Sequence, residues 1–324
     1  MNDYIIFNEA CIYNNESTIL FIQSRRTITN ISIINSNDDK IYNIDYTICN
    51  VEGLPCFDYG ITIHDNNKTT NINIIINNIK LSNIKIYYPF DEIEKHISSN
   101  MNIVSTLVKN YNHRLDEWIQ YNIKLGFDKI IIFNNEASKS HSLNEGNDCY
   151  EKMNVVTDKY KDCVYVINFP YSAFYGTHWN NIQRQSLHIS LTAFNNKCNF
   201  CAYIDADEFI YMSNTNNIKM FLKDFNKTLQ IHSNILTNKN NKDIISNNIL
   251  SLCNYIGENS YTKVLIYMKN IPCIQGSNNI IKYLPNPHAT PYDVKIDKAI
   301  IMYYHCWVNE RYQYNTSQKY ISLL

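Results

Sequence analysis

A change in hydrophobic periodicity near residue 95 constrains the fold of this chain more than any other feature. Up to residue 88, short runs rich in Ile, Tyr and Thr alternate with Asn, Asp and Gly, and none shows a 3.6-residue period. Such runs are typical of an antiparallel sheet or sandwich. We therefore expect an all-β module over residues 1–90, a boundary in the polar segment 89–96, and a second domain over residues 98–324. A support or acceptor-recognition role is all that the β module suggests.

From residue 102 onward, strands alternate with helices. Residues 102–108 and 129–133 are apolar runs of the kind found in strands that are covered on both faces. Between them, apolar residues recur at helical spacing from Leu115 to Leu125, and Gly126 suits a helix C-terminus. This β-α-β unit predicts a parallel strand pair with a right-handed crossover. Further runs make this half an α/β domain: a strand at 164–167, a helix at 180–195 and a strand at 201–204.

Three acidic residues, Asp205, Asp207 and Glu208, follow the last of these strands. Open α/β sheets bind ligands at the carboxyl ends of their strands. Carboxylates this close together repel one another unless a cation or hydrogen-bond donors compensate them, so the cluster suggests a divalent metal. The ordinary alternative is that these residues cap a following helix. Cys198 and Cys201 form a C-x-x-C pair, but no second ligand pair is near enough to predict zinc.

Two enzyme classes place a D-x-D motif after a strand. Haloacid-dehalogenase-like phosphotransferases use the first Asp as a nucleophile, on the first strand of the domain, usually with Thr or Val four residues later. Here Phe209 holds that later position, and several strands precede Asp205. Nucleotide-sugar glycosyltransferases place the motif in the middle of an α/β domain, so its position favours this second class. A non-catalytic carbohydrate-binding or structural surface protein is the third possibility.

Several segments around the motif resemble glycosyltransferase family 92. The match is closest over residues 102–212 and looser over 255–320, where Tyr304-His305 resembles the family's H-Y element. The segments that carry the resemblance are Thr106–Asn110, Leu115–Asn122, Leu125–Asp128, Ile132–Asn135, the helix with Gln183 and Arg184, and Ala202–Ile210. This chain departs from the family pattern at Tyr111, Asn122 and Asn134, where Glu, His and Asp are usual.

The resemblance implies a glycosyltransferase A-type (GT-A) fold, Mn²⁺ or Mg²⁺, and inversion at the anomeric carbon. The expected partners are a nucleotide-sugar donor, with a UDP-sugar favoured, and a glycan or glycoprotein acceptor. Asp205 would contact the ribose or the metal, Asp207 would ligate the metal, and His305 would be a further metal ligand. The remaining candidates for donor binding are Lys109, Asn110, Asn134, Asn135, Gln183 and Arg184.

An inverting transfer needs a general base within hydrogen-bond reach of the acceptor hydroxyl. Glu258 is the first candidate because it is a carboxylate in a predicted loop, Gly257–Ser260, well after the D-x-D motif. Glu208 and Asp293 compete with it, and an ordinary solvated role for Glu258 is equally consistent with the sequence. Trp179 is a candidate for stacking on a sugar, and His288 for contacting phosphate or metal.

Charge and hydropathy exclude other classes of function. The 29 Lys and Arg against 30 Asp and Glu give a net charge of −1, so binding of nucleic acid through bulk charge is not expected. The sequence shows no apolar run long enough for a membrane span or a secretory signal, and its ten cysteines are scattered. A cytoplasmic location is expected. The abundance of Asn and Ile is typical of an AT-rich coding sequence and suggests a viral or protist source.

Overall fold

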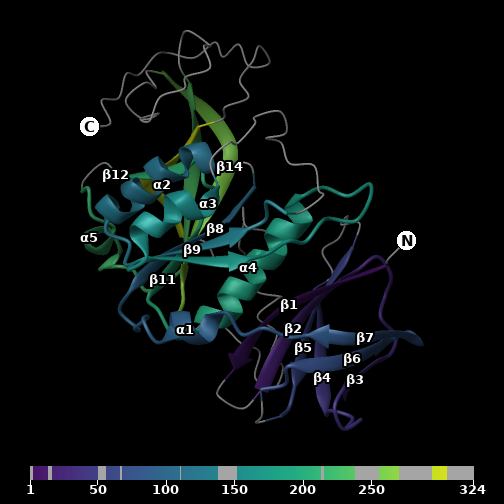
Figure 1. Cartoon of the computed structure of the whole chain (residues 1–324). Coiled ribbons are helices and arrows are strands. Elements are labelled where there is room, and N and C mark those ends of the chain that lie inside the picture. The colour runs from purple at the N-terminus through teal and green to yellow at the C-terminus, as the bar shows by residue number, and fades with distance from the viewer. Residues whose placement is uncertain are drawn as a thin grey trace.

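The chain has a mixed α/β fold. The computed structural model describes residues 3–13, 17–49, 56–65, 68–109, 111–137, 152–212, 215–237, 255–269 and 294–304 (Figure 1). Two small antiparallel sheets come from the N-terminal quarter of the chain, and one large mixed sheet with helices on its faces comes from the rest. Among the described residues, none of the helices has the length and apolar character needed to cross a membrane.

The N-terminal strands form two sheets that pack face to face. One sheet has the order β1-β2-β5-β4, with β1 at Tyr4–Tyr13, β2 at Ser17–Ser24, β5 at Phe57–Ile63 and β4 at Ile44–Cys49. The other has the order β3-β6-β7, with β3 at Ile31–Asn35, β6 at Asn71–Ile76 and β7 at Ile79–Lys85. Leu20 and Ile22 of β2 share a core with Ile72 and Ile74 of β6.

The second half contains an eight-stranded sheet with the order β10-β9-β8-β11-β14-β13-β15-β12. Four neighbouring strands run parallel, within a residue of the predicted bounds: β8 (Asn102–Val108), β9 (Lys129–Asn134), β10 (Val164–Asn168) and β11 (Phe200–Tyr203). The remaining strands are β12 (Glu208–Met212), β13 (Leu229–Thr237), β14 (Tyr255–Tyr267) and β15 (Val294–Tyr304). Strand β14 runs antiparallel to β11.

Helices cover both faces of the parallel strands. On one face lie α2 (Asn112–Leu125) and α3 (Met153–Thr157), which is followed by a short 3₁₀ turn at Asp158–Tyr160. On the other face lie α1 (Phe90–Glu94), in the segment predicted to be a turn, and α4 (Asn180–Phe194). Helix α5 (Ile218–Leu222) follows β12. Helix α2 ends as predicted at Gly126, whose φ of 99° is unfavourable for residues with a Cβ.

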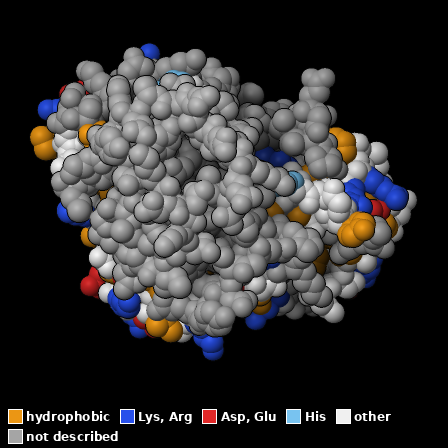
Figure 2. Space-filling model, turned by 90° about the horizontal axis from the view of Figure 1, so that it is seen from above, with side chains coloured by type: hydrophobic (Ala, Val, Ile, Leu, Met, Phe, Trp, Pro, Cys, Tyr) orange, Lys and Arg blue, Asp and Glu red, His pale blue; other side chains and the backbone are white. Residues whose placement is uncertain are grey.

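The described charged side chains do not gather into one surface of a single sign in the view of Figure 2. Lys and Arg side chains are spread around the visible rim, with hydrophobic, acidic and other polar side chains between them. Several lysines are paired with carboxylates, as in the ion pairs Lys40–Asp65 and Lys219–Asp128. The mixed character of this visible face is in keeping with the balanced charge of the sequence.

The N-terminal strands and the α/β half share one hydrophobic core. Phe7 of β1 and Phe21 of β2 pack with Ile182 and Ile189 of α4 and with Phe133 of β9. Helix α4 is therefore enclosed between the large sheet and the N-terminal sheet (Figure 1), and residues 181–194 are all buried. The predicted boundary at residues 89–96 separates two kinds of sheet, but the core continues across it.

A buried carboxyl group also joins the two halves. The Tyr171 hydroxyl donates a hydrogen bond to Glu9 Oε2 over 2.7 Å and accepts one from the Asn8 amide over 2.6 Å. Burial raises the pKa of Glu9 to about 7, although the bond from Tyr171 acts in the opposite direction. The folded state therefore keeps a proton that the unfolded chain loses above its ordinary carboxyl pKa.

We expect the free energy of unfolding to fall as pH rises from about 4.5 to about 7 because of Glu9. Above that window the loss of unfolding free energy caused by ionising buried Glu9 is constant. Glu9→Gln should recover at most about 3 kcal/mol of this loss. Urea denaturation of both proteins at pH 5 and pH 8 measures the effect. Lys95→Gln, which alters an exposed ion pair with Glu92, is the control. An equal pH dependence in Glu9→Gln and the parent protein would contradict the assignment.

Candidate functional site

The candidate site lies at the carboxyl ends of the four parallel strands. Strands β8, β9 and β10 follow one another across the sheet, and the chain then returns to place β11 on the other side of β8. The strand order therefore reverses between β8 and β11, which is where open α/β sheets form their ligand crevice. Asp205 lies two residues after β11, beside this reversal.

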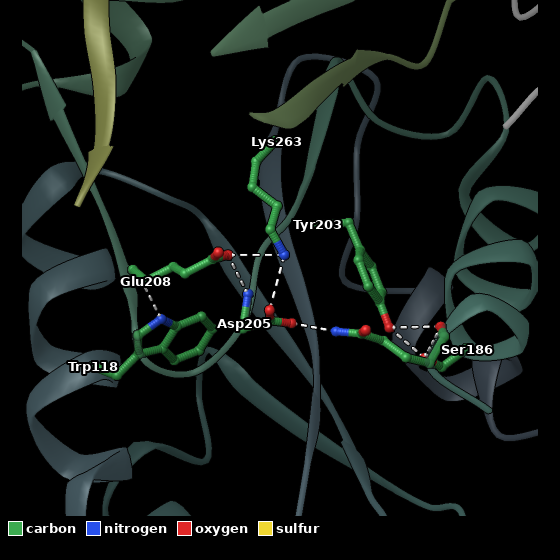
Figure 3. A network of polar contacts seen from close by, with 7 residues as sticks. Trp118, Ser186, Tyr203, Asp205, Glu208 and Lys263 are labelled. Carbon is green, nitrogen blue, oxygen red and sulfur yellow. Dashed lines mark hydrogen bonds and ion pairs between the residues drawn. The ribbon is translucent and has the colours of Figure 1, made fainter. Parts of the chain in front are cut away.

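Asp205 and Glu208 are joined by a buried lysine that sequence reasoning missed (Figure 3). Lys263 on β14 places its Nζ 2.8 Å from Asp205 Oδ2 and 3.1 Å from Glu208 Oε2. The same Glu208 oxygen accepts a 2.8 Å bond from the Asp205 amide. Register explains this arrangement, because Tyr203 pairs with Val264 and Lys263 therefore lies beside the residues that follow β11.

Two other elements complete this network. The Gln183 side chain, from the first turn of α4, donates a hydrogen bond to Asp205 Oδ1. The Tyr203 hydroxyl donates to the Gln183 carbonyl over 3.0 Å, and the indole of Trp118 on α2 donates to the Glu208 carbonyl over 2.9 Å. The orientation of Asp205 is therefore set by contacts from α4 and β14, and the backbone of Glu208 is fixed by α2.

The cluster contains more negative charge than the described residues around it compensate. Burial, opposed by Lys263, raises the pKa of Glu208 to about 7, and the negative charge of Asp205 adds to the increase. Loss of hydration, then repulsion from Asp205 and Glu208, raises the pKa of Asp207 well above its usual value. Burial acts to lower the pKa of Lys263, but the two carboxylates raise it overall. With every group ionised, three carboxylates and one ammonium leave two negative charges uncompensated.

Asp207 differs from its two acidic neighbours because no side chain of another described residue forms a hydrogen bond or ion pair with its half-buried carboxylate, which is hydrogen-bonded to its own backbone amide. Both oxygens of Asp205 already have partners, and Glu208 is only 3% exposed. A free carboxylate in a cluster with excess negative charge fits the oxygen chemistry of Mg²⁺ or Mn²⁺. Among the described residues, no group of three or more His, Cys, Asp or Glu side chains could hold a metal, so these residues alone do not complete a site.

The element that begins at Glu208 corrects one expectation. Asp205, Asp207 and Glu208 do not cap a helix, because Glu208 is the first residue of strand β12. Glu208 also does not fit the predicted role of general base. It is buried, and one of its carboxylate oxygens is bound to Lys263 and to the Asp205 amide, so its side chain is turned into the protein.

The polar residues at the end of β9 have two different environments. Asn135 is fully buried and donates to the Phe169 and Tyr171 carbonyls over 2.6 and 2.9 Å, while its Oδ1 accepts from the indole of Trp179. It therefore holds the loop that leads into α4, and it also holds Trp179. Asn134 is half-buried and lines an open pocket of about 590 Å³, within the usual size of ligand sites. Other polar residues around this pocket are Glu136, Lys152, Asn154, Asp158 and Lys161.

Arg184 is not at the candidate site. Successive helix residues point about 100° apart, so Gln183 faces the end of β11 while Arg184 faces the N-terminal strands. There its guanidinium forms a buried ion pair with Asp58 of β5. The predicted contact between Arg184 and a donor does not fit this location. Lys109, at the end of β8, is buried.

Several predicted residues cannot be compared with the structure. Asn110, His288, Asp293 and His305 lie outside the described residues. The backbone of Glu258 is described, and it corrects an expectation, because Gly257–Ser260 is part of β14 and is not a loop. Asn234 of β13 is the register partner of Glu258.

The sequence around Lys263 has a pattern that could have identified this residue as a buried lysine with a charged partner. It stands within the run Tyr261–Met268, which is otherwise almost entirely apolar and reads as a buried strand. A lysine in such a strand requires a buried counter-charge, and the acidic cluster after β11 is a candidate for that partner.

Comparison with known proteins adds little to this description. No known protein family matches the chain, and no curated protein matches it. Among solved structures, the chain is similar to a Bacillus anthracis protein assigned as a glucose-1-phosphate thymidylyltransferase, determined in complex with a sucrose. The sequences are 12% identical, the match covers 63% of this chain and 89% of the other, and the TM-score is 0.30. A TM-score this low supports no statement about fold or function.

Proposed function

We propose that this protein is a metal-dependent glycosyltransferase of the GT-A type, which transfers a sugar from a nucleotide-sugar donor, with a UDP-sugar favoured, to a glycan or protein acceptor with inversion. The observation that carries the proposal is the carboxylate of Asp207, which has no partner side chain in the described part of the chain and lies in a cluster whose carboxylates exceed the one described cation, Lys263, by two charges. The reversal of strand order beside Asp205 supports a ligand at this position.

Different residues would bind the metal and the donor. Asp207 would hold the metal directly, because no side chain of the other described residues is bonded to its carboxylate. Asp205 would face the donor with a fixed orientation, since Gln183 and Lys263 restrain both of its oxygens. When bound, the metal would supply positive charge to the departing diphosphate. Asn134 and the polar pocket beside it would lie on the nucleoside side of the crevice.

The same contacts weigh against the phosphotransferase alternative. A nucleophilic Asp needs an oxygen that can reach a phosphorus atom, whereas one oxygen of Asp205 is bound to Lys263 and the other to Gln183. Trapping with beryllium fluoride tests this point directly. We expect no complex on Asp205, and a stable complex that is lost in Asp205→Asn would favour the phosphotransferase.

Titration calorimetry with UDP tests the proposed function. We expect binding in the presence of Mn²⁺, and loss of binding when EDTA is added. Hydrolysis of a panel of UDP, GDP and CMP sugars in the presence of Mn²⁺ would then identify the donor. A protein that binds no nucleotide with Mn²⁺, Mg²⁺ or Ca²⁺ would contradict the proposal and favour a non-catalytic carbohydrate-binding or structural role.

A further inference from the structure

The first turn of α4, residues 180–183, connects the candidate site to the N-terminal sheet. Gln183, at its end, donates to Asp205 on the side of the large sheet. Asn181 and Arg184 face the opposite way, toward β2 and β5. The start of α4 therefore contacts the candidate site on one side. On the other side it is held by polar contacts with the N-terminal strands, which we call the anchor.

The anchor is a network of buried polar groups. The Arg184 Nε donates to Asp58 Oδ2, and Gln23 Nε2 donates to Asp58 Oδ1 over 2.9 Å. Arg184 Nη1 donates to Asn181 Oδ1 over 3.0 Å, and Gln23 Nε2 also donates to the Asn181 carbonyl over 3.2 Å. All four residues are at most 4% exposed. Because the groups are removed from water, alternative arrangements would leave charges or amides unsatisfied.

The anchor adds to limited capping at the start of α4, where His178 Nδ1 accepts a 3.2 Å hydrogen bond from the Asn180 amide. Helices usually begin with a side chain that accepts a hydrogen bond from the first turn. Trp179 occupies that position and provides no such bond. The contact of Gln23 with the Asn181 carbonyl restrains the turn from outside the helix, and Arg184 ties the Asn181 side chain to the pair with Asp58.

We propose that Asp58 and Arg184 are positioning residues, which hold the first turn of α4 so that Gln183 orients Asp205. This inference rests on the proposed function for its effect on catalysis. It gives the N-terminal β strands a role in assembling the site. An isolated buried ion pair would affect stability alone, whereas this pair lies one residue along the helix from the side chain that contacts Asp205.

The test replaces Asp58 with Asn, which keeps the shape of the side chain and removes its charge. We expect Asp58→Asn to remain folded by near-ultraviolet circular dichroism and to bind UDP with Mn²⁺ about 10–100-fold more weakly, as for losses of outer contacts in metal sites. Ser190→Ala is the matched control, because it removes a buried hydrogen bond between Ser190 of α4 and Ser105 of β8, farther along the helix. That control should change the affinity less than about twofold.

A second readout does not depend on nucleotide binding. The side-chain amide signal of Gln183, assigned in ¹⁵N-labelled protein by its loss in Gln183→Leu, reports the contact with Asp205. It should shift in Asp58→Asn and stay in place in Ser190→Ala. Arg184→Lys, which keeps the charge but loses the fork of donors, replaces Asp58→Asn if that variant does not fold.

The outcomes separate the two proposals. If the parent protein binds no nucleotide but the Gln183 signal shifts in Asp58→Asn, the proposed function fails and the positioning role stands. If folded Asp58→Asn or Arg184→Lys keeps both the Gln183 signal and the affinity for UDP, the positioning role is overturned and the proposed function stands.

Discussion

Replacing Asp207 with Asn is expected to abolish metal-dependent nucleotide binding and to leave the protein at least as stable as the parent. The amide cannot supply the charged oxygen that Mn²⁺ requires, so we expect UDP affinity in Mn²⁺ to fall by more than about 100-fold, beyond the range for losing an outer contact. Stability should not fall, because the carboxylate of Asp207 has no partner side chain bonded to it among the described residues, is repelled by Asp205 and Glu208, and can keep the bond from its own amide through the Asn side-chain oxygen. Calorimetry and thermal unfolding measure the two effects.

If Asp207→Asn weakens UDP binding while stability stays the same or rises, Asp207 is retained for function and not for stability. Asp205→Asn is the comparison, since it makes the same chemical change two residues away but removes the charge that faces Lys263. That variant should lose about 1–3 kcal/mol of unfolding free energy. If Asp207→Asn binds Mn²⁺ and UDP as tightly as the parent, Asp207 is not a metal ligand and the proposed function loses its main support.

Local sequence patterns predicted the strands of the α/β half closely, because their signal is contained in each segment. The run Ile130–Phe133 is apolar throughout, and it forms the centre of β9, covered by helices on both faces. Helix α2 similarly follows from the spacing of Leu115, Trp118 and Ile119, which all enter one core. The position of Asp205 after β11 was also readable, since it depends only on where an apolar run ends.

Contacts between distant segments could not be predicted in the same way. Gln183 and Arg184 are neighbours in the sequence and were assigned together, yet α4 turns one toward Asp205 and the other toward Asp58. Separating them requires knowing that the N-terminal sheet covers the outer face of α4. The same sheet accounts for the burial of Asn181 and Arg184, which a helix open to solvent on that side would expose.

Replacing Lys263 with Met should produce the largest loss of stability of any single substitution proposed for this protein. The ammonium group is 1% exposed and bridges Asp205 and Glu208, so its removal leaves two carboxylates with no cation between them. Breaking a buried ion pair by removing one partner costs about 3–5 kcal/mol, mainly because the remaining charge stays buried. Urea denaturation at pH 7 measures the difference in unfolding free energy.

Lys219→Met is the matched control, because it makes the same change in an ion pair with Asp128 in which the lysine side chain is 51% exposed. An exposed pair contributes less than about 1 kcal/mol, so the two variants should differ by several-fold in their effect. Adding Glu208→Gln to Lys263→Met should recover part of the loss, since it removes one of the uncompensated charges. Equal losses in Lys263→Met and Lys219→Met would contradict the buried bridge, and with it the restraint that Lys263 places on Asp205.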